Sequence, residues 1–93
     1  MSTQVEKAPS TEQQVRGTIR RFILSSTRVT RLDDDANLFE SGLANSLFAV
    51  QLMTFVKKTF AIAVDMDDLD IENFKSLDAT TAFVLRKKGH PVD

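Results

Sequence analysis

Residues 45–60, Asn45-Ser-Leu-Phe-Ala-Val-Gln-Leu-Met-Thr-Phe-Val-Lys-Lys-Thr-Phe60, form the most apolar segment of the chain. Asn45 is a good helix N-cap, because its side-chain oxygen can accept a hydrogen bond from a backbone N–H of the first turn. The pattern therefore predicts a helix over 46–60 with a wide buried face and one exposed stripe. The buried face is expected to hold Leu47, Phe48, Val50, Leu52, Met53, Phe55, Val56 and Phe60. The stripe is expected to hold Gln51, Thr54, Lys57 and Lys58, and its two lysines suit the negative end of the helix dipole.

An earlier helix is predicted from about Thr11 to Leu24. Ser10 followed by Gln13 fits a capping box, and apolar residues then recur at helical spacing at Val15, Ile19, Phe22 and Ile23. Residues 25–45 lose this periodicity, and a connection of that length inside a small domain is often functional. Its apolar residues are expected to hold it against the helices: Leu32, Leu38, Phe39 and Leu43. The acidic run 33–35 is expected to be a solvated turn.

The C-terminal third is expected to contain a short helix and a longer one. Residues 61–64 form a buried connector, and 67–74 a short helix anchored by Leu69 and Phe74. Ser76 then caps a helix over 77–87, which ends in a basic turn before Gly89. The predicted fold class is all-α: a four-helix bundle with three main helices, one short third helix and a long loop between the first two. The predicted domain covers 10–89, with a disordered tail at 1–9 and a C-terminal tail at 90–93.

Composition excludes several kinds of chemistry. The 93 residues include no Cys and a single His, His90, so no disulfide, thiolate nucleophile or Cys-ligated zinc can form. We expect no catalytic residue. We also expect no metal site, since the acidic residues at 65–70 lack the central Gly and closing Glu of a calcium loop. The net charge of −1 and the lack of a long apolar run favour a cytoplasmic monomer that binds neither membrane nor nucleic acid.

The stretch Leu38-Phe-Glu-Ser-Gly-Leu-Ala-Asn-Ser-Leu47 is the chemically distinctive part of the chain. Gly42 allows a backbone conformation closed to other residues, and Leu43 and Leu47 are expected to be buried anchors. Ser46 then presents a hydroxyl at a helix N-terminus, where free N–H groups and the helix dipole favour an anion. Because Asn45 already supplies the cap, Ser46 is better interpreted as an attachment point for a phosphate ester than as a capping residue.

At these residues the chain resembles the acyl carrier and peptidyl carrier protein family. The family motif is Gly-x-Asp-Ser-Leu or Gly-x-x-Asp-Ser-Leu at the start of the second helix, and this chain has Gly-Leu-Ala-Asn-Ser-Leu at 42–47. The resemblance covers about residues 11–88, because the order of helices and the long first loop are also the family's. It implies a carrier, not an enzyme, in which a separate phosphopantetheinyl transferase attaches 4′-phosphopantetheine from coenzyme A to Ser46.

The resemblance also implies which residues surround this group and which meet partner proteins. Asn45, Leu47, Val64 and the start of the short third helix would lie beside the arm. The exposed side of the second helix would be read by acyl-loading enzymes, extender-unit-modifying enzymes, an acyltransferase or a ketosynthase. The predicted partner interface contains Leu47, Phe48, Gln51, Thr54, Lys57 and Lys58. Residues 45–49 and 68–74 look most like discrete carriers of methoxymalonyl-, hydroxymalonyl- or aminomalonyl-type extender units in polyketide and hybrid peptide pathways.

Two residues depart from the family pattern. Asn45 replaces the usual Asp, which keeps the cap acceptor and removes a charge. Neutral or basic residues at 51, 57 and 58 replace the acidic residues of fatty-acid carriers, which favours a specialised set of partners. The alternative interpretation is a helical protein-interaction or nucleic-acid-binding domain without a prosthetic group, suggested by the arginines of the first third: Arg16, Arg20, Arg21, Arg28 and Arg31.

Overall fold

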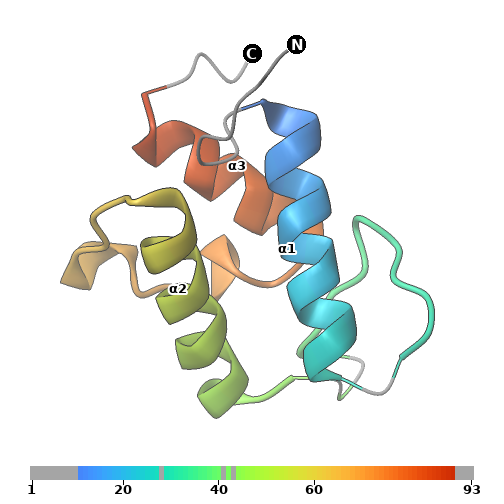
Figure 1. Cartoon of the computed structure of the whole chain (residues 1–93). Helices are drawn as coiled ribbons and strands as arrows, with labels where there is room; N and C mark the ends of the chain where they lie inside the picture. The colour runs from blue at the N-terminus through green and yellow to red at the C-terminus, as the bar shows by residue number, and fades with distance from the viewer. Residues whose placement is uncertain (1–10, 28, 41, 43, 90–93) are drawn as a thin grey trace, which may run out of the picture.

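The structure, a computed structural model, describes residues 11–27, 29–40, 42 and 44–89. It contains three α-helices, α1 (Glu12–Ser26), α2 (Ser46–Phe60) and α3 (Leu77–Lys87), and two short 3-10 helices, η1 (Met66–Asp68) and η2 (Ile71–Asn73). In Figure 1, α1 and α2 run in roughly opposite directions and α3 passes behind α1. No strand occurs among the described residues, which confirms the all-α prediction. The predicted tails at 1–9 and 90–93 lie outside the described residues.

The core is built from aliphatic and phenylalanine side chains of every helix. The side chains buried completely or almost so include Val15, Ile19 and Ile23 from α1, Leu52, Val56 and Phe60 from α2, and Leu77, Phe83 and Val84 from α3. Phe74 packs edge-on against Phe83, with ring centroids 5.1 Å apart. Removing this much apolar surface from water is the main stabilising contribution to a domain of this size. No helix of the described part is long and apolar enough to cross a membrane.

α1 begins one residue later than the capping box predicted from the sequence. Thr11, not Ser10, is the N-cap: its hydroxyl accepts the Gln14 N–H at 3.1 Å, and the Gln14 side chain accepts the Thr11 N–H at 3.2 Å. Both Ser-x-x-Gln and Thr-x-x-Gln fit the same template, so the pattern alone did not separate them. Starting at Glu12 lets its carboxylate lie in the first turn, where the dipole favours it, and pair with Arg16 one turn later.

α2 has the predicted bounds but not the predicted buried face. Phe48, Leu52, Val56 and Phe60 are buried as expected. Leu47 and Val50, in contrast, are 65% and 53% exposed, so the expectation that Leu47 is a buried anchor was wrong. One line of residues faces the core because α2 packs against its neighbours on one side only. The helix ends at Ala61, which adopts a left-handed conformation (φ 55°) and donates its N–H to the Lys57 carbonyl.

The predicted short third helix over 67–74 is divided into η1 and η2. Acidic side chains compete with the helical hydrogen-bond pattern here. Asp68 accepts the Asp65 N–H at 2.9 Å, and Asp70 accepts the Glu72 N–H at 2.9 Å, so each carboxylate caps a separate turn. Leu69 lies between the turns and is half exposed, which corrects its predicted role as a buried anchor; Phe74 is buried as expected.

α3 has the predicted bounds and caps. Ser76 accepts the Ala79 N–H at 3.0 Å, and Gly89 follows the helix with φ 81°. The connector before η1 is buried only at alternate positions, since Ile62 is buried whereas Ala61 and Ala63 are exposed. This alternation differs from the predicted buried connector.

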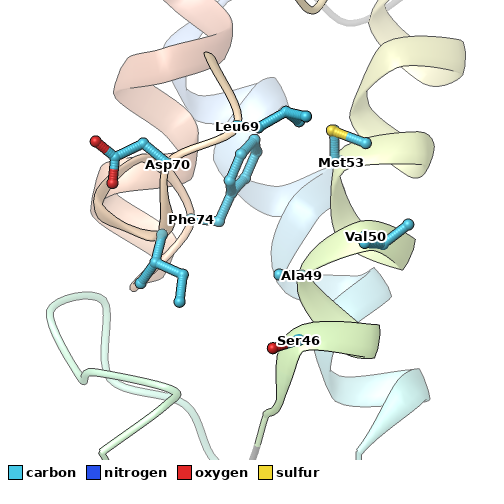
Figure 2. A pocket seen from close by; sticks show the side chains of 8 residues that line it. Ser46, Ala49, Val50, Met53, Leu69, Asp70 and Phe74 are labelled. Atoms are coloured by element: carbon cyan, nitrogen blue, oxygen red, sulfur yellow. The ribbon is translucent and has the colours of Figure 1, made fainter. Parts of the chain in front are cut away.

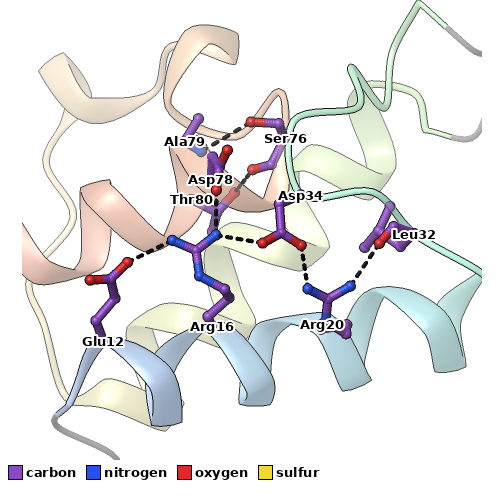
Figure 3. Close-up of polar contacts among 9 residues, drawn as sticks. All are labelled: Glu12, Arg16, Arg20, Leu32, Asp34, Ser76, Asp78, Ala79 and Thr80. Atoms are coloured by element: carbon purple, nitrogen blue, oxygen red, sulfur yellow. Dashed lines mark hydrogen bonds and ion pairs between the residues drawn. The ribbon is translucent and has the colours of Figure 1, made fainter.

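The loop between α1 and α2 is fixed by polar contacts as well as by buried Leu32 and Leu38. Asp34 forms ion pairs with Arg16 and Arg20, and its carbonyl accepts the Asp78 N–H at 2.9 Å (Figure 3). The predicted turn at 33–35 is present, and Asp33 and Asp35 are exposed, but Asp34 is half-buried and bound to both arginines. Arg16 also pairs with Glu12 and Asp78, and hydrogen bonds from its guanidinium to Glu12 and Asp78 raise the pKa of Arg16 above its usual value. One arginine thus joins α1, the loop and α3.

Candidate functional site

Ser46 occupies the first position of α2, and its side chain is exposed. Asn45 performs the capping, because its Oδ1 accepts the Phe48 N–H at 3.0 Å and its carbonyl accepts the Ala49 N–H at 3.0 Å. Within the described ranges no side chain or backbone group hydrogen-bonds the Ser46 hydroxyl. The first turn of α2 contains no acidic residue, so the positive end of its dipole is not neutralised. This arrangement leaves a free hydroxyl where a covalently attached anion is favoured.

A small apolar pocket opens beside this hydroxyl. It has a volume of about 180 Å³ and lies between α2 and the η1–η2 segment; its lining comprises Ser46, Ala49, Val50, Met53, Leu69, Asp70, Ile71 and Phe74. In Figure 2 Ser46 and Ala49 point from α2 toward the segment that contains Phe74, whereas the Val50 side chain and the Asp70 carboxylate point away from the space between the two elements. The resemblance placed the start of the short third helix beside the arm but named none of residues 69–71, since their individual positions depend on how the two 3-10 turns pack against α2.

Exposed apolar side chains gather on α2 and on the 66–71 segment, and three of them line this pocket: Val50, Leu69 and Ile71. The large hydrophobic residues left exposed in the described part are Leu47, Val50, Met66, Leu69 and Ile71, each at least half accessible. All five belong to the first half of α2 or to the segment facing it. A gathering of this kind on a small domain typically marks a surface that meets another molecule.

The predicted partner interface is only partly accessible. Gln51, Thr54, Lys57 and Lys58 are all exposed, as the predicted stripe requires. Phe48 is 6% exposed and belongs to the core, so its assignment to the interface was wrong. A phenylalanine one turn before Leu52 on the buried face has no route to a partner.

Val64 is not among the residues that line the pocket beside Ser46. It is partly buried and packs against the hydrophobic core after the connector Ala61–Ala63. The prediction that Val64 lies beside the arm is thus not supported by this pocket, whose far wall is formed by Leu69, Ile71 and Phe74 instead. Leu43, the other predicted anchor, lies outside the described residues.

The η1 turn is attached to the end of α3 by an ion pair. Lys87 Nζ lies 2.8 Å from Asp68 Oδ2. The hydrogen bond from Lys87, with a second from the Asp65 N–H, holds the pKa of Asp68 below its usual range. In turn, the bond to Asp68 raises the pKa of Lys87. Asp68 and Asp70 therefore accept capping hydrogen bonds, and Asp68 is also an ion-pair partner. No cluster of metal-ligand side chains is found among the described residues.

Two of the five arginines behind the nucleic-acid interpretation, Arg16 and Arg20, are engaged within the fold. Arg16 and Arg20 pair with Glu12, Asp34 and Asp78, and Arg20 also donates to the Leu32 carbonyl at 2.7 Å. Arg28 lies outside the described residues. A nucleic-acid surface would require these cations to be free for phosphates. Arg16 and Arg20 therefore stabilise the fold through their ion pairs with Asp34, and we call these three residues the clasp.

Comparison with known families identifies the chain. The model of the family described as "Phosphopantetheine attachment site" matches residues 15–84. The chain belongs to the phosphopantetheine attachment family. No curated protein and no solved structure matches it significantly. The matched range includes α2, the pocket and most of α1 and of α3.

This membership establishes the coarse function. The chain is a carrier protein with a 4′-phosphopantetheine prosthetic group, and as a carrier it meets a phosphopantetheinyl transferase and biosynthetic enzymes. The residues present fit such a group, because a free, exposed hydroxyl adjoins a helix N-terminus without first-turn acids and an apolar pocket. When bound, the group supplies a terminal thiol that holds an acyl cargo as a thioester.

Proposed function

We propose that Ser46 is the attachment residue, and that the chain delivers an acyl or aminoacyl thioester to enzymes of polyketide or hybrid peptide biosynthesis. The proposal rests on the different roles of Asn45 and Ser46 at the start of α2. Asn45 makes the capping hydrogen bond, while the neighbouring hydroxyl stays exposed and free. A serine that capped the helix would have its hydroxyl engaged with a backbone N–H.

The surroundings of Ser46 support the same assignment. A phosphodiester on Ser46 Oγ would carry a negative charge at the N-terminus of a helix of 15 residues, where the dipole and the first-turn N–H groups stabilise anions. No carboxylate of α2 would repel it, since the helix contains none. The pocket lined by Met53, Leu69 and Phe74 begins at the same serine and offers an apolar surface to whatever extends from it.

The charge of the exposed side of α2 and the resemblance of two segments support the proposed pathway. Lys57 and Lys58 are exposed at the end of α2, so partners adapted to an acidic second helix would meet the wrong charge. The resemblance of 45–49 and 68–74 to carriers of methoxymalonyl-, hydroxymalonyl- or aminomalonyl-type units favours extender-unit enzymes as partners. The carrier itself contributes position and charge, not a catalytic group.

The test is intact-protein mass spectrometry after incubation with coenzyme A and a broad-specificity phosphopantetheinyl transferase. The parent chain should gain the mass of one phosphopantetheine group, and Ser46→Ala should gain none while keeping its helix content and melting temperature. Peptide mapping then identifies the modified residue. Modification of another serine would overturn the assignment, and so would full modification of the Ser46→Ala variant.

A further inference from the structure

A groove runs between α1 and α2, separate from the pocket beside Ser46. It consists of two adjoining hollows, both shallow and open to solvent, that share Phe22 of α1 and Phe55 of α2. Val50 stands on the ridge between this groove and the Ser46 pocket, because it lines both the second hollow and the pocket. We call this feature the α1–α2 groove.

The floor of the α1–α2 groove is aromatic. The rings of Phe22 and Phe55 stack with centroids 4.2 Å apart, and Phe22 also stacks on buried Phe48 at 6.1 Å. Phe22 and Phe55 are only partly buried, so part of each ring faces the groove. Small polar side chains line its sides, including Thr18, Ser25 and Thr54. An aromatic floor with a polar rim resembles the centre of a protein interface more than an ordinary solvated surface.

The charge around this groove has one sign. Arg21 lines the groove and is exposed, and Lys58 follows Thr54 and Phe55 by four and three residues, which puts it at the groove's edge on α2. Neither cation has an ion-pair partner among the described residues. The only acidic residue of α1 and α2 is Glu12, which is engaged by Arg16. The surroundings of the groove are therefore basic, whereas the acidic residues of 65–72 belong to the segment that faces the Ser46 pocket.

We propose that the α1–α2 groove is a docking surface for an acidic amphipathic helix of a partner protein. Large apolar side chains of that helix would pack on Phe22 and Phe55, and its carboxylates would face Arg21 and Lys58. Helix-in-groove recognition uses this combination of apolar anchors and flanking charge. The proposal extends the carrier function with a partner surface that does not include Ser46, so a partner could hold the carrier there while the arm is used elsewhere.

The test uses the full chain, labelled with ¹⁵N, and two synthetic helical peptides. Both peptides carry Leu and Phe at i, i+3, i+4 and i+7; one has Glu at the flanking positions and the other has Lys. The acidic peptide should shift the resonances of residues around Phe22 and Phe55, and its affinity should fall as salt increases. The basic peptide should leave those resonances unchanged.

Charge-reversal variants locate the contact. Arg21→Glu with Lys58→Glu should weaken the acidic peptide about tenfold or more, because two attractive charges become repulsive. The matched control, Arg31→Glu with Arg86→Glu, makes the same change in net charge at two exposed residues of the loop and of α3 that do not line the groove, and it should bind like the parent. Circular dichroism checks that both double variants remain folded.

Three outcomes would overturn the proposal: no binding of the acidic peptide, equal binding of both peptides, or equal losses in the two double variants. Concentration-dependent self-association that is lost in Arg21→Glu with Lys58→Glu would make a second copy the occupant and also overturn it. Preferential binding of single-stranded DNA at the groove would have the same effect. Ser46→Ala should bind the acidic peptide as the parent does, so failure of the groove and failure of the attachment site are read separately.

Discussion

At the start of α2, two adjacent residues divide two tasks. Asn45 closes the helix by accepting the Phe48 N–H, and Ser46 keeps a hydroxyl directed away from the capping network. Interchanging these tasks would place the hydroxyl in a hydrogen bond and remove it from any partner enzyme. The position of the attachment hydroxyl thus depends on its neighbour's amide.

Asn45→Ala should lower the free energy of unfolding by about 1 kcal/mol, because the Phe48 N–H loses its acceptor. Chemical denaturation of the parent and the variant measures the loss. Asn45→Asp is the matched control: a carboxylate retains the acceptor and favours the helix dipole, so its stability should equal or exceed that of the parent. An unchanged midpoint for Asn45→Ala would show that the cap does not stabilise α2.

At the scale of elements, α3 and α2 were predictable to the residue because their ends carry strong local signals. Ser76 and Asn45 each accept a first-turn N–H, and Gly89 supplies the left-handed residue after α3. The start of α1 was predicted one residue early because two overlapping capping boxes fit the sequence. The capping pattern shows that a helix begins near residue 11. The ion pair of Glu12 with Arg16 supports a start at Glu12, with Thr11 as the N-cap.

The faces of α2 were less predictable than its ends. Leu47, Phe48 and Val50 have similar hydropathy, yet only Phe48 is buried. Apolar residues occur nearly all round this helix, so periodicity does not single out one face. Which face of α2 is buried depends on where α1 and residues 65–74 pack against it. The hydropathy pattern of α2 holds no information about that packing. For the same reason Ser46 was named from its motif, whereas the resemblance placed only the start of the short third helix beside it and did not name Leu69 or Ile71.

The attachment of η1 to α3 should depend on pH. Because the folded-state pKa of Asp68 lies below its unfolded value, its ion pair with Lys87 stabilises the fold above the unfolded pKa of about 4 and loses this effect as pH falls through the folded pKa. Asp68→Asn should therefore unfold more readily than the parent at pH 7. The difference should vanish at the acid end of the series.

Thermal unfolding from pH 7 to pH 2 measures this difference. Lys87→Gln is the matched control, since it removes the other partner and should show the same dependence on pH. The loss of stability in the double variant should be smaller than the sum of the losses in the two single variants, because both single changes remove the same ion pair. A difference between Asp68→Asn and the parent that stays constant down to pH 2 would contradict the assignment.

At the scale of the whole molecule, charge is separated between two faces of α2. One side borders the acidic 65–72 segment and the pocket at Ser46, and the other borders the basic α1–α2 groove. The net charge of −1 conceals this separation. A carrier that meets several enzymes can then present different chemistry to each, with charge governing the rate and selectivity of encounter.

The loop that leads to Ser46 is held by the clasp of Arg16, Arg20 and Asp34, so its rigidity should depend on one carboxylate. Asp34→Ala should lower the free energy of unfolding by about 1 kcal/mol, since it removes two partly exposed ion pairs. Amide exchange should quicken at Asp78, whose N–H donates to the Asp34 carbonyl, and at Leu38, whose N–H donates to the Lys75 carbonyl.

Asp33→Ala is the matched control for this clasp. It makes the same change in charge one residue away, where the single ion pair of Asp33 is a 3.9 Å contact between exposed side chains. Its stability and exchange rates should match those of the parent, and the loss in Asp34→Ala should shrink in high salt because the ion pairs are partly exposed. Equal losses of stability in the two variants would mean that the total negative charge of the turn holds the loop in place, and not the ion pairs of Asp34 with Arg16 and Arg20.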